Sequence, residues 1–233
     1  MNNKHELSRR IYNQKMVEKT EKKIKLLGIN NKLETIDFLN SRLIVCILVF
    51  FISLYIFKFG FIIGPILTII MYYLIEKTIL DDKIKKRKEE LESEAMHFFE
   101  VLTLSLETGR NLEEALNVTM NSIDGDLSLE FKEAMRETKF GKSLKESLVD
   151  MQKNIPSESI NNIILALTQA NMYGSSIIET MYNQVDYLRE KRKLEIKAEI
   201  SKVPIKISII SVLFFIPLIL LIILGPAILS FIG

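Results

Sequence analysis

The sequence is poor in residues that bind metals or form disulfides. It has one cysteine, Cys46, and two histidines among its 233 residues. A lone cysteine forms no internal disulfide, and three such side chains are too few for a zinc site built by the chain alone. Cys46 lies inside an apolar block, so we expect it to pack as a small buried hydrophobic side chain. We expect neither a metal nor a cofactor.

Motifs of catalysis are also missing. Gly141-Lys142-Ser143 looks like the end of a phosphate-binding loop, but Arg136 stands where that loop needs its first glycine. A phosphate-binding loop also needs a strand before it, whereas we expect a helix before Gly141 in this chain. No serine or cysteine is accompanied by a suitably placed histidine. We therefore predict that the chain is not an enzyme in its own right.

Charge is nearly absent from two blocks, residues 43–75 and 207–233. A helix needs about 20 apolar residues to cross a bilayer, and the second block qualifies. The first would be about 50 Å long as one helix, so we divide it at Lys58, where Gly60 allows a tight turn. We predict a transmembrane hairpin at residues 43–77, with a re-entrant hairpin as the alternative, and a final span at residues 204–232.

Lysine and arginine predict the orientation of these spans. Basic residues gather before the hairpin, directly after it at residues 83–88, and before the last span at residues 189–206, whereas the opposite side has only Lys58. We therefore expect an inner-membrane, multi-pass protein with its N-terminus cytoplasmic. We assign amphipathic helices to residues 1–42 and expect no signal peptide. Side chains such as Arg42 would extend to the interface and contact lipid.

The middle of the chain, residues 80–202, has apolar residues at helical spacing and no alternating strand pattern. We predict a cytoplasmic bundle of six helices, which makes the protein all-α with transmembrane helices on both sides. Between residues 89 and 188 there are 18 Asp and Glu against 7 Lys and Arg. This acidic surface is either solvated or docks a basic partner, and it argues against binding of nucleic acid.

A short pattern repeats at three expected helix junctions, 32 and 33 residues apart. Each copy has a glycine to end one helix, an N-cap residue two positions later, and a glutamate at the capping-box position. We interpret these glutamates as helix caps and not as a catalytic cluster. The residues are Gly109, Asn111 and Glu114, then Gly141, Ser143 and Glu146, then Gly174, Ser176 and Glu179.

Residues 104–116, which include the first copy of this pattern, resemble the opening motif of the type II secretion F domain. Residues 141–148, Pro156, residues 169–174 and residues 189–198 match later elements in order. The segments 24–38 and 202–228 are similar to those of platform proteins of tight-adherence (Tad) pili. The resemblance implies a cytoplasmic six-helix domain on an inner-membrane platform that assembles a type IV-like pilus or secretion filament.

The same resemblance implies contacts with a cytoplasmic assembly ATPase and with pilin-like subunits. Larger members have two F domains and this chain has one, which implies pairing with itself or with a sister subunit. A helix from Ile177 to about Val203 would lead into the last span, with Pro204 and Pro217 as membrane hinges. The alternative is a transporter or channel component, but the spans lack Asp, Glu, Arg and His.

Overall fold

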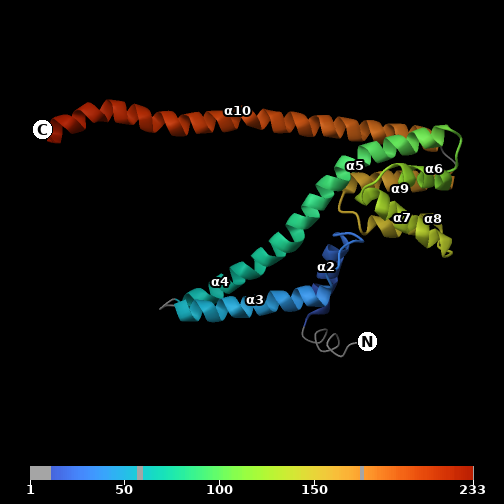
Figure 1. The fold of residues 1–233 in the computed structure, drawn as a ribbon, viewed down its shortest axis with the longest axis horizontal. Coiled ribbons are helices and arrows are strands. Elements are labelled where there is room, and N and C mark those ends of the chain that lie inside the picture. The colour runs from blue at the N-terminus through green and yellow to red at the C-terminus, as the bar shows by residue number, and fades with distance from the viewer. Residues whose placement is uncertain (1–11, 57–59, 174–175, 233) are drawn as a thin grey trace. The chain divides into compact units, whose positions relative to one another are not determined.

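The computed structural model describes residues 12–56, 60–173 and 176–232, and regular structure within them is helical (Figure 1). The chain forms two compact units, Met1–Val185 and Asp186–Gly233. Helix α2 (Gln14–Lys25) comes first, with Asn13 as its N-cap. It buries Thr20 and Ile24, and its other side is strongly charged. This amphipathic pattern is the one expected of the N-terminal region.

Two apolar helices follow and lie side by side, α3 (Thr35–Ile56) and α4 (Gly60–Glu76) (Figure 1). Most of their apolar side chains are exposed, as a surface that faces lipid requires. Ser53 is buried where α3 meets α4, and a Cβ at Gly64 would lie 2.6 Å from its hydroxyl. A small residue therefore lets these helices approach closely. The turn at Lys58 lies outside the described residues.

α4 continues into the bundle without an intervening loop. A short π-helix, η1 (Lys77–Asp81), joins it to α5 (Asp82–Glu107). The described part of the chain contains three helical segments long and apolar enough to cross a membrane, Thr35–Ile56, Phe61–Glu107 and Ile177–Leu224. The protein is therefore a multi-pass membrane protein by the length and composition of its helices.

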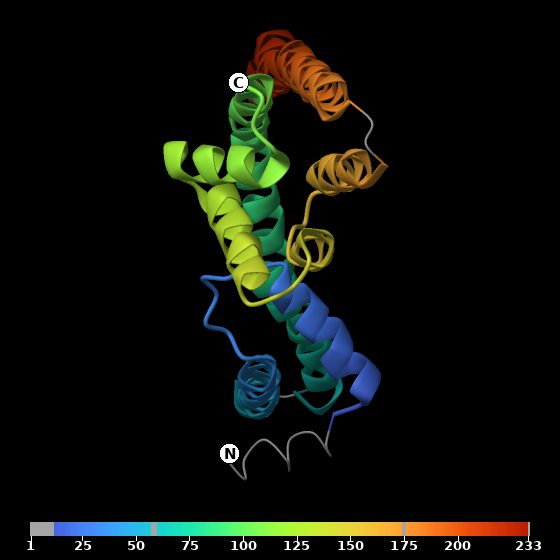
Figure 2. The same ribbon diagram turned by 90° about the vertical axis from the view of Figure 1, so that its right-hand side faces the viewer.

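The next four helices are α6 (Leu112–Ser122), α7 (Asp126–Lys139), α8 (Leu144–Gln152) and α9 (Glu158–Tyr173). α6, α7 and α9 pack against α5, and α8 packs against α7 and α9. Figure 2 shows α6 and α7 on one side of α5 and α8 and α9 on the other. Three fully buried rings, Phe98, Phe99 and Phe131, meet at the centre, with Phe98 stacked on Phe131 at 4.7 Å between centroids. Each buried ring contributes about 2 kcal/mol through removal of apolar surface from water.

The last helix, α10 (Ile177–Ile232), begins in the first unit, where Met181 and Val185 are buried. It remains helical through Pro204 and Pro217, and its apolar side chains from Ile207 to Leu224 are exposed. It is the sixth α-helix after η1, and the bounds 80–202 for the domain stay a prediction. The prediction of an all-α protein with apolar helices before and after the bundle is confirmed.

Candidate coupling interface between the membrane hairpin and the bundle

A buried group of charges lies at the base of the hairpin. Arg42 on α3 is only 3% exposed, and its Nη1 donates to Glu76 Oε2 on α4 at 2.9 Å. Its guanidinium also lies 3.4 Å from the centroid of the Tyr72 ring. The expectation that Arg42 extends to the lipid interface was wrong, because a neighbouring carboxylate and an aromatic face hold it inside the protein.

The same carboxylate connects the hairpin to α2. Lys23 Nζ donates to Glu76 Oε1 at 2.8 Å and to Asp81 Oδ1 on η1 at 2.7 Å. Burial disfavours the ammonium, but hydrogen bonds to Asp81 and Glu76 outweigh it and raise the pKa of Lys23. Four elements, α2, α3, α4 and η1, therefore share one ionic network at the point where the hairpin meets the bundle.

A second buried charge pair lies one step further into the bundle. Arg87 on α5 and Glu130 on α7 are 8% and 2% exposed, and Arg87 Nη2 donates to Glu130 Oε1 at 2.5 Å. Arg87 Nη1 donates to the backbone carbonyls of Leu26 and Asn154, both at 2.7 Å. Burial raises the pKa of Glu130, and the Arg87 guanidinium and the backbone N–H of Ile29 oppose that effect.

Gly28 closes this group, which we call the Arg87 cluster (Gly28, Arg87 and Glu130 with the Leu26 and Asn154 carbonyls). Gly28 has φ +90°, and a Cβ there would lie 2.6 Å from the guanidinium carbon of Arg87. Only glycine combines that backbone conformation with so close an approach. The cluster joins the α2–α3 loop, α5, α7 and the α8–α9 loop.

Sequence reasoning missed the Arg87 cluster, although one signal was present. Arg87 lies one helical turn before Leu91 and two before Ala95, on the apolar stripe of α5, and Glu130 directly precedes the buried Phe131. A charge on an apolar stripe indicates a buried pair, because an isolated charge there is strongly unfavourable. We instead assigned Arg87 to the basic segment that follows the hairpin.

The predicted junction residues lie at separate helix ends and form no common site. At the start of α6, Asn111 Oδ1 accepts from the Glu114 N–H at 2.9 Å, and Glu114 Oε2 accepts from the Asn111 N–H at 3.4 Å. Gly109 precedes this capping box with φ +81°. The pair thus satisfies two backbone donors that the helix itself leaves unpaired.

The second and third copies behave similarly where they are described. Ser143 and Glu146 form a capping box at α8 after Gly141, which has φ +97°. At α10, Ser176 Oγ accepts from the Glu179 N–H at 3.3 Å. Gly174 lies outside the described residues.

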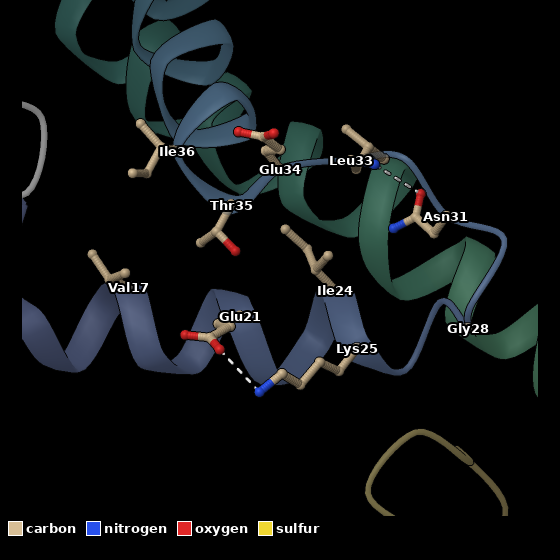
Figure 3. A pocket seen from close by; sticks show the side chains of 10 residues that line it. All are labelled: Val17, Glu21, Ile24, Lys25, Gly28, Asn31, Leu33, Glu34, Thr35 and Ile36. Atoms are coloured by element: carbon tan, nitrogen blue, oxygen red, sulfur yellow. Dashed lines mark hydrogen bonds and ion pairs between the residues drawn. The ribbon is translucent and has the colours of Figure 1, made fainter. Parts of the chain in front are cut away.

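A groove of about 480 Å³ lies between α2 and the start of α3 (Figure 3). Apolar side chains such as Val17 and Ile24 line it, and the ion pair of Glu21 and Lys25, 2.9 Å apart, crosses one wall. Across the described residues, no group of His, Cys, Asp or Glu is placed to hold a metal ion. The groove offers packing surface next to the hairpin and not a reactive centre.

Comparison with known proteins places this architecture in a family. The sequence model of the type II secretion system (T2SS) protein F family matches residues 98–225, which is more than half of the 233-residue chain. No curated protein and no solved structure matches the chain. The matched region runs from the phenylalanine core of α5 into the apolar part of α10. The chain therefore belongs to the type II secretion system protein F family, whose members are non-enzymatic, platform-like membrane proteins of secretion and pilus assembly.

Proposed function

We propose that this chain is an inner-membrane platform subunit of a type IV-like filament of the Tad kind. In this role it couples a cytoplasmic assembly ATPase to the extraction of pilin-like subunits from the bilayer. The family supports an assembly ATPase and pilins as partners in general terms. The likeness of residues 24–38 and 202–228 to Tad platform proteins supports the particular filament.

The observation that carries the proposal is the unbroken helical path from α4 through η1 into α5. One end of this path is the apolar hairpin, and the other is the phenylalanine core of the bundle. The charges around Glu76 and the Arg87 cluster fix α2 and its loop against the same path. A force on the bundle would therefore reach the hairpin through packed helices and not through a flexible loop.

The topology is part of the proposal. Residues 1–42 and the domain at residues 80–202 lie in the cytoplasm, the hairpin at residues 43–77 and the helix at residues 204–232 cross the membrane, and the C-terminus lies outside. The basic clusters support this arrangement. Lipid surrounds the spans, a second platform subunit (a copy of this chain or a sister) pairs with the F domain, and nucleic acid takes no part.

α10 provides a second route from the bundle to the membrane, with Pro204 and Pro217 as the proposed hinges. A test inserts four residues after Pro204. Four alanines keep a helix and rotate its C-terminal part by about 40°, whereas four glycines interrupt it. We expect the glycine insertion to abolish surface filaments, seen by electron microscopy, and the alanine insertion to retain them in part. The assembly ATPase should co-purify with both variants.

Normal filament numbers with the glycine insertion would show that α10 transmits nothing. Failure of the wild-type chain to co-purify with a secretion ATPase would remove the platform function itself. The two results are separate, because co-purification depends on the cytoplasmic domain and filament formation depends on the connection to the membrane.

A further inference from the structure

Charge is unevenly distributed within the F domain. Six of the seven Lys and Arg between residues 89 and 188 lie in the segment 132–153, which covers most of α7 and all of α8. Residues 132–153 contain four Asp and Glu. The rest of the range 89–188 contains fourteen, and Arg110 is its only Lys or Arg. Residues 132–153 are therefore a basic segment of an acidic domain.

The turn between α7 and α8 presents an aromatic side chain to solvent. Phe140 is 84% exposed, although phenylalanine is usually buried. The next residue, Gly141, has φ +97° and open space beyond its Cα. We call residues 139–145 the α7–α8 tip.

The α7–α8 tip has a fixed conformation. The Lys142 N–H donates to the Glu137 carbonyl at 3.3 Å, and its ammonium bonds both Glu137 Oε2 and Asp150 Oδ2 at 2.5 Å. The Ser143–Glu146 capping box holds the following helix. Phe140 is therefore displayed on a preorganised turn, which reduces the entropy lost when a partner binds it.

Two cations of the α7–α8 tip are free to pair with a partner. Lys139 and Lys145 are exposed, and within the described residues neither forms an ion pair. By contrast, Arg136, Lys142 and Lys153 are paired inside the domain. An exposed aromatic side chain flanked by unpaired cations has the composition of a protein-docking site for an acidic surface.

The same chain also offers an exposed surface with acidic side chains. At the α5–α6 corner, which we define as residues 104–113, Leu104 is 59% exposed. Glu107 on the last turn of α5 and Glu113 on the first turn of α6 are exposed, and neither is ion-paired within the described part of the chain. Arg110 Nη1 donates to the Thr108 hydroxyl at 2.9 Å, and within the described residues it forms no ion pair with either carboxylate. The corner therefore combines an exposed apolar side chain with two carboxylates that lack an ion-pair partner among the described residues.

We propose that the α7–α8 tip of one copy docks on the α5–α6 corner of a second copy of this chain. Phe140 packs against Leu104, and Lys139 and Lys145 face Glu107 and Glu113. The proposal deepens the pairing of platform subunits given above and rests on that pairing. Each surface supplies what the other lacks: an exposed apolar group to cover, and unpaired charges of opposite sign.

Photo-crosslinking of the full-length chain tests this contact. A benzophenone amino acid replaces Phe140 in one preparation, which is mixed in detergent with wild-type chain fully labelled with ¹⁵N. Mass spectrometry of the adducts separates contacts between copies from contacts within one copy. We expect heavy-isotope adducts within residues 104–113. Intermolecular adducts confined to another region, or none between copies, would overturn the proposal.

Charge exchange gives an independent test. We expect the double variants Lys139→Glu/Lys145→Glu and Glu107→Lys/Glu113→Lys each to weaken self-association about tenfold in analytical ultracentrifugation. An equimolar mixture should recover it, because each variant retains the surface that the other has lost. Lys132→Glu/Arg136→Glu is the matched control on α7, with the same change in net charge and little expected effect.

The outcomes distinguish this docking surface from the platform function. Association that survives both double variants, or a mixture that fails to recover it, removes the docking surface. The platform proposal then still stands on filament assembly and co-purification of the ATPase. Circular dichroism of every variant checks that the helical content is that of wild type, so weakened association is not mistaken for unfolding.

Discussion

At the scale of single residues, Gly28 is the position where the backbone and a buried charge constrain each other most directly. In Gly28→Ala the new Cβ would lie 2.6 Å from the Arg87 guanidinium, so the guanidinium has to shift from its position against Glu130. We expect a loss of about 3 kcal/mol in unfolding free energy. Gly109→Ala is the matched control, because Gly109 also has positive φ but nothing within 4 Å; we expect about 1 kcal/mol.

Chemical unfolding in detergent, followed by circular dichroism, measures both changes. In an Arg87→Met background the extra loss from Gly28→Ala should disappear, since the group that the Cβ displaces is gone. Equal losses at Gly28 and Gly109 in the wild-type background would contradict a close approach at Gly28.

Asp150 gives a prediction about pH. Hydrogen bonds from Lys142 and Lys153 hold the pKa of its carboxyl at about 2, below its ordinary value of 3.8. Because the folded pKa is the lower one, the carboxylate stabilises the fold fully above about pH 4 and loses this effect as the pH falls to 2. Asp150→Asn should therefore melt slightly below wild type at pH 7 and together with it at pH 2. A difference that persists at pH 2 would show that charge is not the cause.

The residues that could be predicted from the sequence are those whose partners lie nearby in the chain. Asn111 and Glu114 are three positions apart, so helical geometry alone brings them together. Arg87 and Glu130 are 43 positions apart, and their meeting depends on how α5 packs against α7. No local pattern contains that information, which is why the Arg87 cluster became visible only in three dimensions.

At the scale of elements, the capping boxes define where α6 and α8 begin. Asn111→Ala and Ser143→Ala each remove an acceptor for a backbone donor, so we expect each to lower the unfolding free energy by about 1 kcal/mol. Ser122→Ala is the control, because its hydroxyl bonds the Val118 carbonyl inside α6, where the backbone is already paired. Denaturant titration compares the three; a Ser122→Ala loss as large as the others would argue against capping.

Element boundaries were harder to predict than element type. The first membrane helix begins at Thr35, eight residues before the predicted span, because polar residues that end an apolar run do not end a helix. The π-helix η1 has no signal in the sequence, and it occupies the connection where the hairpin enters the bundle. π-Helical segments are frequent at functional sites, which is consistent with a coupling role for this connection.

At the scale of the whole molecule, an ordered set of weak motifs identified the family better than any single motif. The match over residues 98–225 confirms the F-domain resemblance. The Tad assignment and the orientation in the membrane remain predictions, because they depend on the chain ends and on charge counts. The orientation has a direct test.

In a Cys46→Ser background, Lys58→Cys and Asp124→Cys each give the chain one cysteine for labelling. We expect a membrane-impermeant maleimide to modify the cysteine at position 58 in intact spheroplasts and the one at position 124 only after lysis. The reason is that positive charge is retained on the cytoplasmic side, and the basic segments flank the domain that contains Asp124. Asp124 is exposed, so burial would not explain protection. Labelling of position 124 in intact spheroplasts would place the F domain outside, beyond the reach of any cytoplasmic ATPase.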